Sequence, residues 1–434
     1  MSIRALRIFP LLSILLAAQP AQDPTALAKK ALDLVLAGQY AEFLQMSTAD
    51  VQKGISVAEL AKVGAMIKTY GAVEKIADPV VTKSGPNSIV VFPAKFANQN
   101  INFRITVNAA GLVAGFYQLP GGVDWQRPEY SRPATFQERD VTVGEGEWKL
   151  PGTLTVPVGP GPFPAAVLVH GSGPNDRDET VGGAKVFKDL AEGLASRGIV
   201  VLRYEKRTLQ YRARVAGIAN FTVQEETVDD AVKAIALVRT QAEVNGARVF
   251  VIGHSLGAYV APRIAERDGK LAGLVLMAGN ARPVEDLMVE QVTYMGATGT
   301  DPANAKVFQA QLEKAKAFQA NVKKLEPGDE DSPALGGVPV AYWVDLKGYD
   351  PAAAARKLGI PMLILQGERD YQVTMADFGM WKTAVGNAKG VLMKSYPALN
   401  HLFVAGEGKS LPAEYAKPGH VAPQVIDDIA KFVK

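Results

Sequence analysis

The sequence has 434 residues, of which 48% are hydrophobic, enough to build the cores of more than one folded domain. It contains no cysteine, which excludes disulfide bonds, thiolate metal sites and lipid attachment at cysteine. The formal net charge is +3, and subtracting the N-terminal Arg4 and Arg7 leaves +1, so the chain lacks the basic surplus typical of nucleic-acid-binding proteins.

The first 22 residues have the pattern of a secretory signal peptide. A basic start with Arg4 and Arg7 precedes an apolar run, residues 8–18, which is too short to span a bilayer stably. We expect cleavage between Ala18 and Gln22, with an uncleaved anchor as the alternative. Together with the lack of cysteine, this predicts an exported bacterial protein, periplasmic or secreted.

Residues 23–118 are predicted to form a small α+β domain, with helices first and an antiparallel sheet after them. Apolar residues recur at helical spacing between residues 24 and 70, whereas apolar and polar residues alternate at 101–107, as in a half-buried strand. A segment rich in proline and glycine, residues 119–134, then indicates a linker. Neighbouring strands are expected at residues 89–96 and 112–117.

Residues 135–434 alternate buried strands with helices. Continuous apolar runs at 165–169 and 199–202 are typical of parallel strands buried on both faces. Thr222 and Glu225 form a capping box that begins a helix. Repeated strand–helix units predict a mostly parallel sheet with helices on both faces. Further strands are expected at residues 248–252, 273–277, 361–365 and 390–393, and further helices at 186–197, 258–267 and the C-terminus.

One long stretch between two of these strands has no strand signal, and we expect it to be an inserted lid, about residues 281–350. Crossing over an α/β sheet needs far fewer residues. Helices are predicted at 283–296 and 302–325. Tyr342 and Trp343 either line a pocket above the sheet or pack in the core of the lid.

Ser255 is predicted to be a nucleophile, because residues 253–257 read Gly-His-Ser-Leu-Gly between a strand and a helix. A sharp strand–turn–helix connection exposes the serine hydroxyl and needs glycine where a Cβ would collide. The alternative is an ordinary tight turn with a capping serine. A serine hydroxyl is a weak nucleophile, so it needs a general base nearby.

His401 is the favoured base among the four histidines, because it follows the last predicted strand and precedes the final helix. His254 adjoins the nucleophile and points the wrong way. His170 ends a buried strand. His420, at the start of the final helix, remains the alternative.

Asp370 is the favoured carboxylate to orient the base, because it follows a predicted strand at its C-terminal end, where sites form in parallel sheets. Glu368 and Asp377 are the competing acids. The chain order Ser255, Asp370, His401 is that of α/β-hydrolases.

The negative charge of a tetrahedral intermediate needs preset N–H donors. The backbone N–H of Leu256 is one candidate. The loop after the strand at 165–169 offers the N–H of Ser172, with Gly171 next. The alternative is a flexible loop that uses its glycines for turning only.

Two charged segments have less specific patterns. Asp176 and Asp178 form either a metal cluster or an ion-paired loop, and the second reading is favoured. Residues 203–207, Arg-Tyr-Glu-Lys-Arg, either hold an anionic substrate group or form a salt-bridged support for the site. No phosphate loop, dinucleotide-binding glycine pattern or HExxH string occurs, so no cofactor or metal is expected.

These motifs together resemble bacterial α/β-hydrolases of the carboxylesterase and serine aminopeptidase-like (S33) group, over residues 135–434. The resemblance implies an α/β-hydrolase fold with Ser255, Asp370 and His401 as its triad. Residues 23–118 are similar to the small DUF3887-type domain that precedes such hydrolases. The matching strings are HGSGPNDRD at 170–178, LRYEKR at 202–207, GHSLGA at 253–258 and QGERDYQV at 366–373.

The expected function is therefore that of a serine carboxylesterase, which hydrolyses short-chain acyl esters through an acyl-enzyme intermediate. Its partner is a small-molecule ester, and an oligomer is compatible with the sequence. A peptidase of the same fold is the first alternative; it needs an acidic lid residue such as Glu285, Asp286 or Glu290 to hold an α-ammonium group. A binding protein with an inert hydrolase domain is the second.

Overall fold

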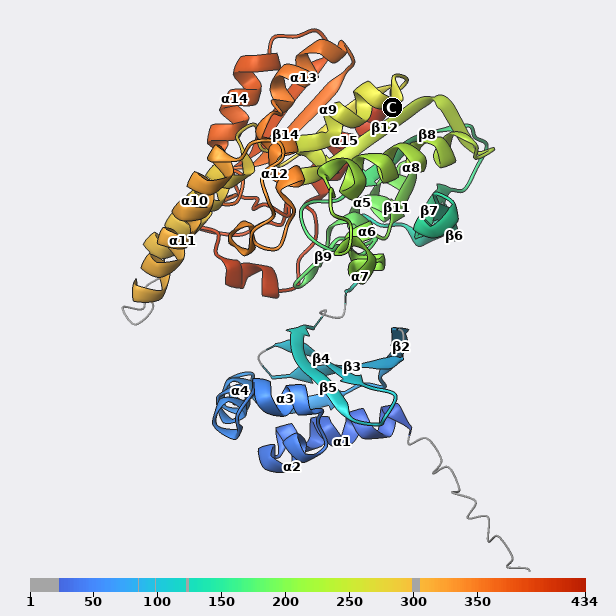
Figure 1. Cartoon of the computed structure of the whole chain (residues 1–434). Coiled ribbons are helices and arrows are strands. Elements are labelled where there is room, and N and C mark those ends of the chain that lie inside the picture. The colour runs from blue at the N-terminus through green and yellow to red at the C-terminus, as the bar shows by residue number, and fades with distance from the viewer. Residues whose placement is uncertain (1–22, 85, 98, 122–124, 299–304) are drawn as a thin grey trace, which may run out of the picture. The chain divides into compact units, whose positions relative to one another are not determined.

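The computed structural model describes residues 23–434 except 85, 98, 122–124 and 299–304. The chain divides into two compact units, residues 1–122 and 123–434 (Figure 1). The expected signal peptide, with its cleavage between Ala18 and Gln22, lies outside the described residues. Every helix of the described chain is too short or too polar to cross a membrane.

The small unit has the predicted order of helices followed by an antiparallel sheet. Ser56 and Glu59 form a capping box that begins the fourth helix. In the sheet, buried and half-buried residues alternate along the two central strands, and Phe103 and Ile105 are fully buried beneath the helices. The elements are α1 (Pro24–Leu36), α2 (Tyr40–Gln45), α3 (Ala49–Gly54), α4 (Val57–Thr69), β1 (Val73–Ile76), β2 (Val80–Ser84), β3 (Asn87–Phe96), β4 (Asn100–Val107) and β5 (Val113–Pro120).

The segment expected to be a linker, residues 119–134, is one only in part. Strand β5 extends into its first residues. From Trp125 onward the segment belongs to the larger unit, where Trp125 donates a hydrogen bond to Asp189 at 2.8 Å and Arg127 pairs with Glu192 at 2.6 Å. Both acids are fully buried on a helix of that unit. Composition alone does not show that these side chains have buried partners.

The larger unit is built on an eight-stranded sheet in the order β15-β14-β13-β12-β8-β11-β7-β6. The pairs β6–β7 and β7–β11 are antiparallel, and the five other pairs of this sheet are parallel. This is the predicted α/β-hydrolase fold. The strands are β6 (Phe136–Val143), β7 (Leu150–Pro157), β8 (Phe163–Val169), β11 (Val200–Tyr204), β12 (Val244–His254), β13 (Gly273–Met277), β14 (Met362–Gly367) and β15 (Val391–Tyr396), and a small hairpin is formed by β9 (Thr180–Val181) and β10 (Ala184–Lys185).

Helices cover both faces of this sheet, and alternate residues of each strand enter different cores. In β8, Val167 packs toward one face and Leu168 toward the other, and both are fully buried. The first face is covered by α8 (Asp229–Arg239), α9 (Leu256–Asp268), α13 (Pro351–Leu358) and α14 (Met375–Val385), and the second by α5 (Val186–Ala195) and α15 (Pro423–Val433).

The insertion between β13 and β14 consists of helices, as expected for the lid. It contains α10 (Val284–Thr298), α11 (Ala305–Lys324) and α12 (Val340–Lys347) (Figure 1). Helix α13, which the sequence patterns did not reveal, packs against α9 and α14 and leads back to the sheet. Two short helices, α6 (Arg207–Gln210) and α7 (Arg212–Val215), follow β11.

Candidate active site

Ser255 lies on a strained turn between β12 and α9. Its backbone has φ 52° and ψ −117°, a conformation that costs a non-glycine residue about 1–3 kcal/mol and is concentrated at functional sites. A Cβ at Gly257 would lie 2.0 Å from the carbonyl oxygen of Val169, and one at Gly253 would lie 2.4 Å from the backbone of Gly257. Both glycines are therefore needed for β8, the turn and α9 to approach this closely.

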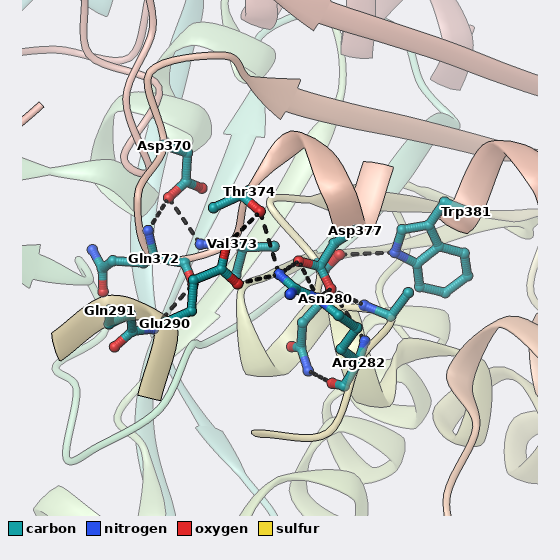
Figure 2. Close-up of polar contacts among 12 residues, drawn as sticks. Asn280, Arg282, Glu290, Gln291, Asp370, Gln372, Val373, Thr374, Asp377 and Trp381 are labelled. Atoms are coloured by element: carbon teal, nitrogen blue, oxygen red, sulfur yellow. Dashed lines mark hydrogen bonds and ion pairs between the residues drawn. The ribbon is translucent and has the colours of Figure 1, made fainter. Parts of the chain in front are cut away.

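Asp370 and His401 meet at the carboxyl ends of β14 and β15. The Nδ1 atom of His401 lies 2.7 Å from Oδ2 of Asp370, and both residues are buried, each 5% exposed. The other carboxylate oxygen accepts hydrogen bonds from the backbone N–H groups of Gln372 and Val373, at 2.8 and 3.0 Å (Figure 2). These donors stabilise the carboxylate, which in turn places the imidazole proton on Nδ1.

The Nε2 atom of His401 has no hydrogen-bond partner among the described residues, so it is free to accept a proton. His401 and Ser255 line the same cavity. An imidazole fixed in this tautomer, lining the same cavity as a serine on a strained turn, is an arrangement suited to general-base catalysis.

The competing candidates have other partners. His420 bonds to the buried Asp189 at 3.2 Å and does not line the cavity. Glu368 accepts a hydrogen bond from Ser395, and Asp377 binds the backbone N–H groups of Ala281 and Arg282. Neither acid contacts the imidazole of His401.

In the loop after β8, the N–H groups of Gly171 and Ser172 differ in whether they already have an acceptor. The N–H of Gly171 already donates to Oε1 of Glu179 at 2.8 Å, so it is not available to an oxyanion. The amides of Ser172 and Leu256 have no acceptor among the described residues, and both residues line the cavity. Of the two candidates in this loop, the structure therefore leaves Ser172.

A second carboxylate–imidazole pair, which the sequence did not reveal, lies beside the first. Nδ1 of the buried His254 is 3.0 Å from Oε2 of Glu179, and its Nε2 is 3.0 Å from the backbone oxygen of His401. Burial alone would lower the pKa of His254, but the Glu179 carboxylate outweighs it and raises the pKa. Burial alone would raise the pKa of Glu179, and the charge of His254 reverses that effect. The pair joins the nucleophile turn to the loops that carry His401 and Gly171.

Polar contacts join the first lid helix to the acid loop (Figure 2). Arg282, just before α10, contacts the fully buried Asp377 at 2.7 Å and Glu290 of α10 at 2.6 Å. Gln291, also on α10, donates to the backbone oxygen of Gln372 at 3.0 Å. Hydrogen bonds to Asp377 raise the pKa of Arg282, so its charge is permanent. Helix α10 is thus tied to the loop that carries Asp370.

The two charged segments singled out in the sequence, residues 176–178 and 203–207, form ion pairs with other parts of the larger unit. Arg203 contacts Glu138 at 2.7 Å. Asp178 pairs with Lys185 at 3.0 Å. No group of three or more His, Cys, Asp or Glu side chains in the described part of the chain is arranged to hold a metal ion.

The cavity above these groups has a volume of about 1310 Å³ and is lined mainly by apolar side chains. The lid supplies much of that lining, including Tyr342 and Trp343 of α12. Trp343 also packs against Phe318 of α11, so it belongs to the pocket and to the lid core at once. The apolar lining includes Val215, Ile218, Phe221, Val284, Leu287, Met288, Val338, Leu346 and Leu402.

Comparison with known proteins places this chain in a family. The family model "Serine aminopeptidase, S33" matches residues 167–407. Esterase EstD of Thermotoga maritima is 40% identical over 392 residues, which cover 90% of this chain and 90% of that protein. Among solved structures, an esterase of Pyrococcus furiosus is 15% identical with a TM-score of 0.43, covering 69% of this chain and 90% of that one. Est1E of Butyrivibrio proteoclasticus is 14% identical with a TM-score of 0.43, covering 68% of this chain and 96% of that one. The family model spans more than half of the sequence, and the chain therefore belongs to the serine aminopeptidase (S33) family of α/β-hydrolases.

Proposed function

We propose that the protein is a serine carboxylesterase in which Ser255, His401 and Asp370 form the catalytic triad. The observation that carries the proposal is the 2.7 Å contact between His401 and Asp370, which leaves Nε2 of the base free, in a residue that lines the same cavity as Ser255. The 40% identity to an esterase supports ester hydrolysis as the reaction.

The reaction follows the general scheme for such a triad. His401 removes the proton from Ser255 as the hydroxyl oxygen attacks the ester carbonyl, and the amides of Ser172 and Leu256 donate to the resulting oxyanion. His401 then protonates the leaving alcohol, and an acyl-enzyme remains. Water, deprotonated by His401, attacks the acyl group and releases the acid. Asp370 accepts the hydrogen bond from Nδ1 of His401 and stabilises the imidazolium.

The proposed substrates are short-chain acyl esters, as the family resemblance suggests. The cavity of about 1310 Å³ is larger than a short acyl group requires. Its apolar lining favours an ester whose second group, the alcohol part, is bulky and apolar.

The family description makes a peptidase the second candidate, and the contacts of the lid acids favour the esterase over it. Asp286 pairs with Lys323 at 2.6 Å, and Glu290 pairs with Arg282 at 2.6 Å. Glu285 is buried and does not line the cavity. The carboxylates that do line it, Glu179, Glu226 and Asp331, all bind other groups of the protein. No free carboxylate of the described residues is positioned to bind an α-ammonium group.

Turnover of p-nitrophenyl esters from acetate to palmitate, beside a panel of aminoacyl p-nitroanilides, tests the proposal. We expect ester hydrolysis that is lost in Ser255→Ala, with short acyl chains preferred and little anilide hydrolysis. Efficient release of aminoacyl groups would favour the peptidase. No turnover of either panel by the purified wild type would favour a binding protein with an inert hydrolase fold.

We further propose that the protein is exported after cleavage between Ala18 and Gln22. N-terminal sequencing of the mature protein tests this, and an intact Met1 would contradict it. The small unit remains predicted to be a DUF3887-type domain, and none of the proposed catalytic side chains lies in it.

A further inference from the structure

The peptide unit between Gly171 and Ser172 is held from its carbonyl side by a buried lysine. The ammonium group of Lys206 donates to the Gly171 oxygen at 2.7 Å, and the Asn175 side chain donates to the same oxygen at 3.1 Å. In a planar trans peptide the C=O and the following N–H point in opposite directions. Fixing the Gly171 oxygen therefore fixes the direction in which the Ser172 N–H points.

The Lys206 side chain is only 3% exposed, so its charge needs a partner in the fold. That partner is Glu226, 2.6 Å away and nearly as buried. Glu226 lies in a single π-helical turn, residues 224–228, just before α8. Such turns are rare and often occur at functional sites.

The other oxygen of Glu226 accepts a hydrogen bond from the lid. The hydroxyl group of Tyr342 on α12 donates to it at 2.6 Å, and the Tyr342 ring stacks on Phe221. Burial, followed by the charge of Glu226, raises the pKa of Tyr342, so the hydroxyl stays protonated and remains a donor. Two hydrogen bonds and the ion pair between them thus connect the lid, through Glu226 and Lys206, to the peptide unit between Gly171 and Ser172.

We propose that Lys206 is a positioning residue of the oxyanion hole, held in place by Glu226 and by Tyr342 of the lid. This inference rests on the proposed function. Lys206 touches no reacting atom; it aims the Ser172 N–H and, by polarising the peptide from its oxygen, makes that N–H a stronger donor. Its contribution therefore belongs to the transition state, where the oxyanion exists, and not to substrate binding.

Lys206→Met removes the ammonium group and keeps much of the apolar volume. We expect kcat to fall about 10²–10³-fold, as when one oxyanion donor is lost, while KM stays within about threefold. The affinity for a trifluoromethyl ketone, whose adduct carries an oxyanion, should fall by a similar factor. Tyr342→Phe deletes a single hydroxyl at the far end of the chain and should lower kcat about 3–10-fold, the effect of one hydrogen bond.

Arg207→Met is the matched control. Arg207 is an equally buried cation at the next position, but it pairs with Asp230 at 2.5 Å and contacts no part of the loop that contains Gly171 and Ser172. It should lower the melting temperature and leave kcat within about threefold.

Equal kcat losses in Lys206→Met and Arg207→Met would overturn the inference, as would a rise in KM without a change in kcat. If Lys206→Met does not fold, the same readouts on Tyr342→Phe decide, and unchanged kcat and ketone affinity in that variant would contradict the proposal. The rate at which a fluorophosphonate labels Ser255 needs the oxyanion hole but no ester substrate. It therefore tests Lys206 even if the wild type does not hydrolyse esters, an outcome that would overturn the proposed function alone.

Discussion

Two carboxylate–imidazole pairs lie side by side in this fold, Asp370–His401 and Glu179–His254. Both are buried, and the centres of the two imidazole rings are 4.8 Å apart. The two pairs differ in the contacts of the second ring nitrogen, Nε2. Nε2 of His401 is free of partners among the described residues, whereas Nε2 of His254 contacts the backbone oxygen of His401.

The comparison shows that a carboxylate next to a histidine does not by itself make a catalytic base. In the proposed mechanism, the first pair leaves a proton acceptor at the cavity that Ser255 also lines, where a substrate would exchange protons with it. The second pair has both nitrogens engaged and serves to join three loops. We call Asp370–His401 the chemical pair and Glu179–His254 the structural pair. The predictions below test whether the two pairs differ in this way.

The largest loss of activity is expected when the nucleophile or the base itself is removed. Ser255→Ala and His401→Ala should each lower kcat/KM for p-nitrophenyl acetate about 10⁴-fold or more. The double variant should be no worse than the single ones, because the two residues act as a unit. Circular dichroism checks that each variant is folded. Losses that multiply in the double variant would show that the two side chains act independently.

Neutralising the carboxylate of each pair in turn should lower kcat by different factors. Asp370→Asn removes the charge that sets the tautomer of His401, and we expect kcat to fall about 10³–10⁴-fold. Glu179→Gln loosens Gly171 and His254 without touching the base, and a loss of at most about 10²-fold is expected from misplacement. Steady-state kinetics on both variants measures the difference. A reversed order would exchange the roles of the two pairs.

A third buried histidine sharpens the comparison, because no carboxylate among the described residues bonds to its ring. Nε2 of His170 lies 3.0 Å from the backbone oxygen of Asp176, and burial lowers its pKa from 6.5 to about 4. The folded state therefore binds this proton less readily than the unfolded state does. The neutral His170 side chain therefore contributes fully to the free energy of unfolding above pH 6.5. That contribution is lost as the pH falls toward 4, by up to about 3 kcal/mol.

His170→Gln keeps a donor toward Asp176 and cannot titrate. Urea unfolding between pH 4 and 7 should therefore show a shallower loss of stability in the variant than in the wild type. Parallel curves would mean that His170 titrates in the fold as it does in water.

The stability contributed by the structural pair should depend on pH less strongly than that contributed by His170, and it should fall at both acidic and alkaline pH. The lowered pKa of Glu179 means that its stabilisation is present above its ordinary value, 4.5, and is lost as the pH falls through the lowered pKa. The raised pKa of His254 means that its stabilisation is complete below 6.5 and is lost as the pH rises through the raised pKa. The difference in melting temperature between wild type and Glu179→Gln should therefore be greatest between pH 4.5 and 6.5 and shrink toward alkaline pH. A difference independent of pH would contradict an ionised pair.

The parts of the site that the sequence revealed are those set by local backbone geometry. The turn at Ser255 needs glycine at 253 and 257, so its pattern is visible in five consecutive residues. Asp370 follows a strand that is buried throughout, and His401 follows a strand that begins with the shorter apolar run Val391–Met393. Because parallel strands end at one edge of the sheet, their position relative to Ser255 could be predicted.

The parts that it did not reveal depend on contacts between distant segments. Glu179 and Lys206 hold opposite sides of Gly171, yet nothing in their spacing differs from that of surface charges. The edge strands β6 and β7 were missed for a related reason: β6 is mostly exposed and polar, and β7 contains both proline and glycine. Burial of a charge, or pairing of a polar strand, is a property of the folded chain and leaves no periodic pattern.

The central claim is that His401 makes Ser255 nucleophilic, and active-site labelling tests it most directly. The protein is treated with a fluorophosphonate, digested, and analysed by mass spectrometry for the modified residue and its rate of modification. The account predicts a single adduct on Ser255, formed at least about 10³-fold more slowly in His401→Ala and less than about 10²-fold more slowly in Glu179→Gln. An adduct on another residue, or equal labelling rates in wild type and His401→Ala, would contradict it.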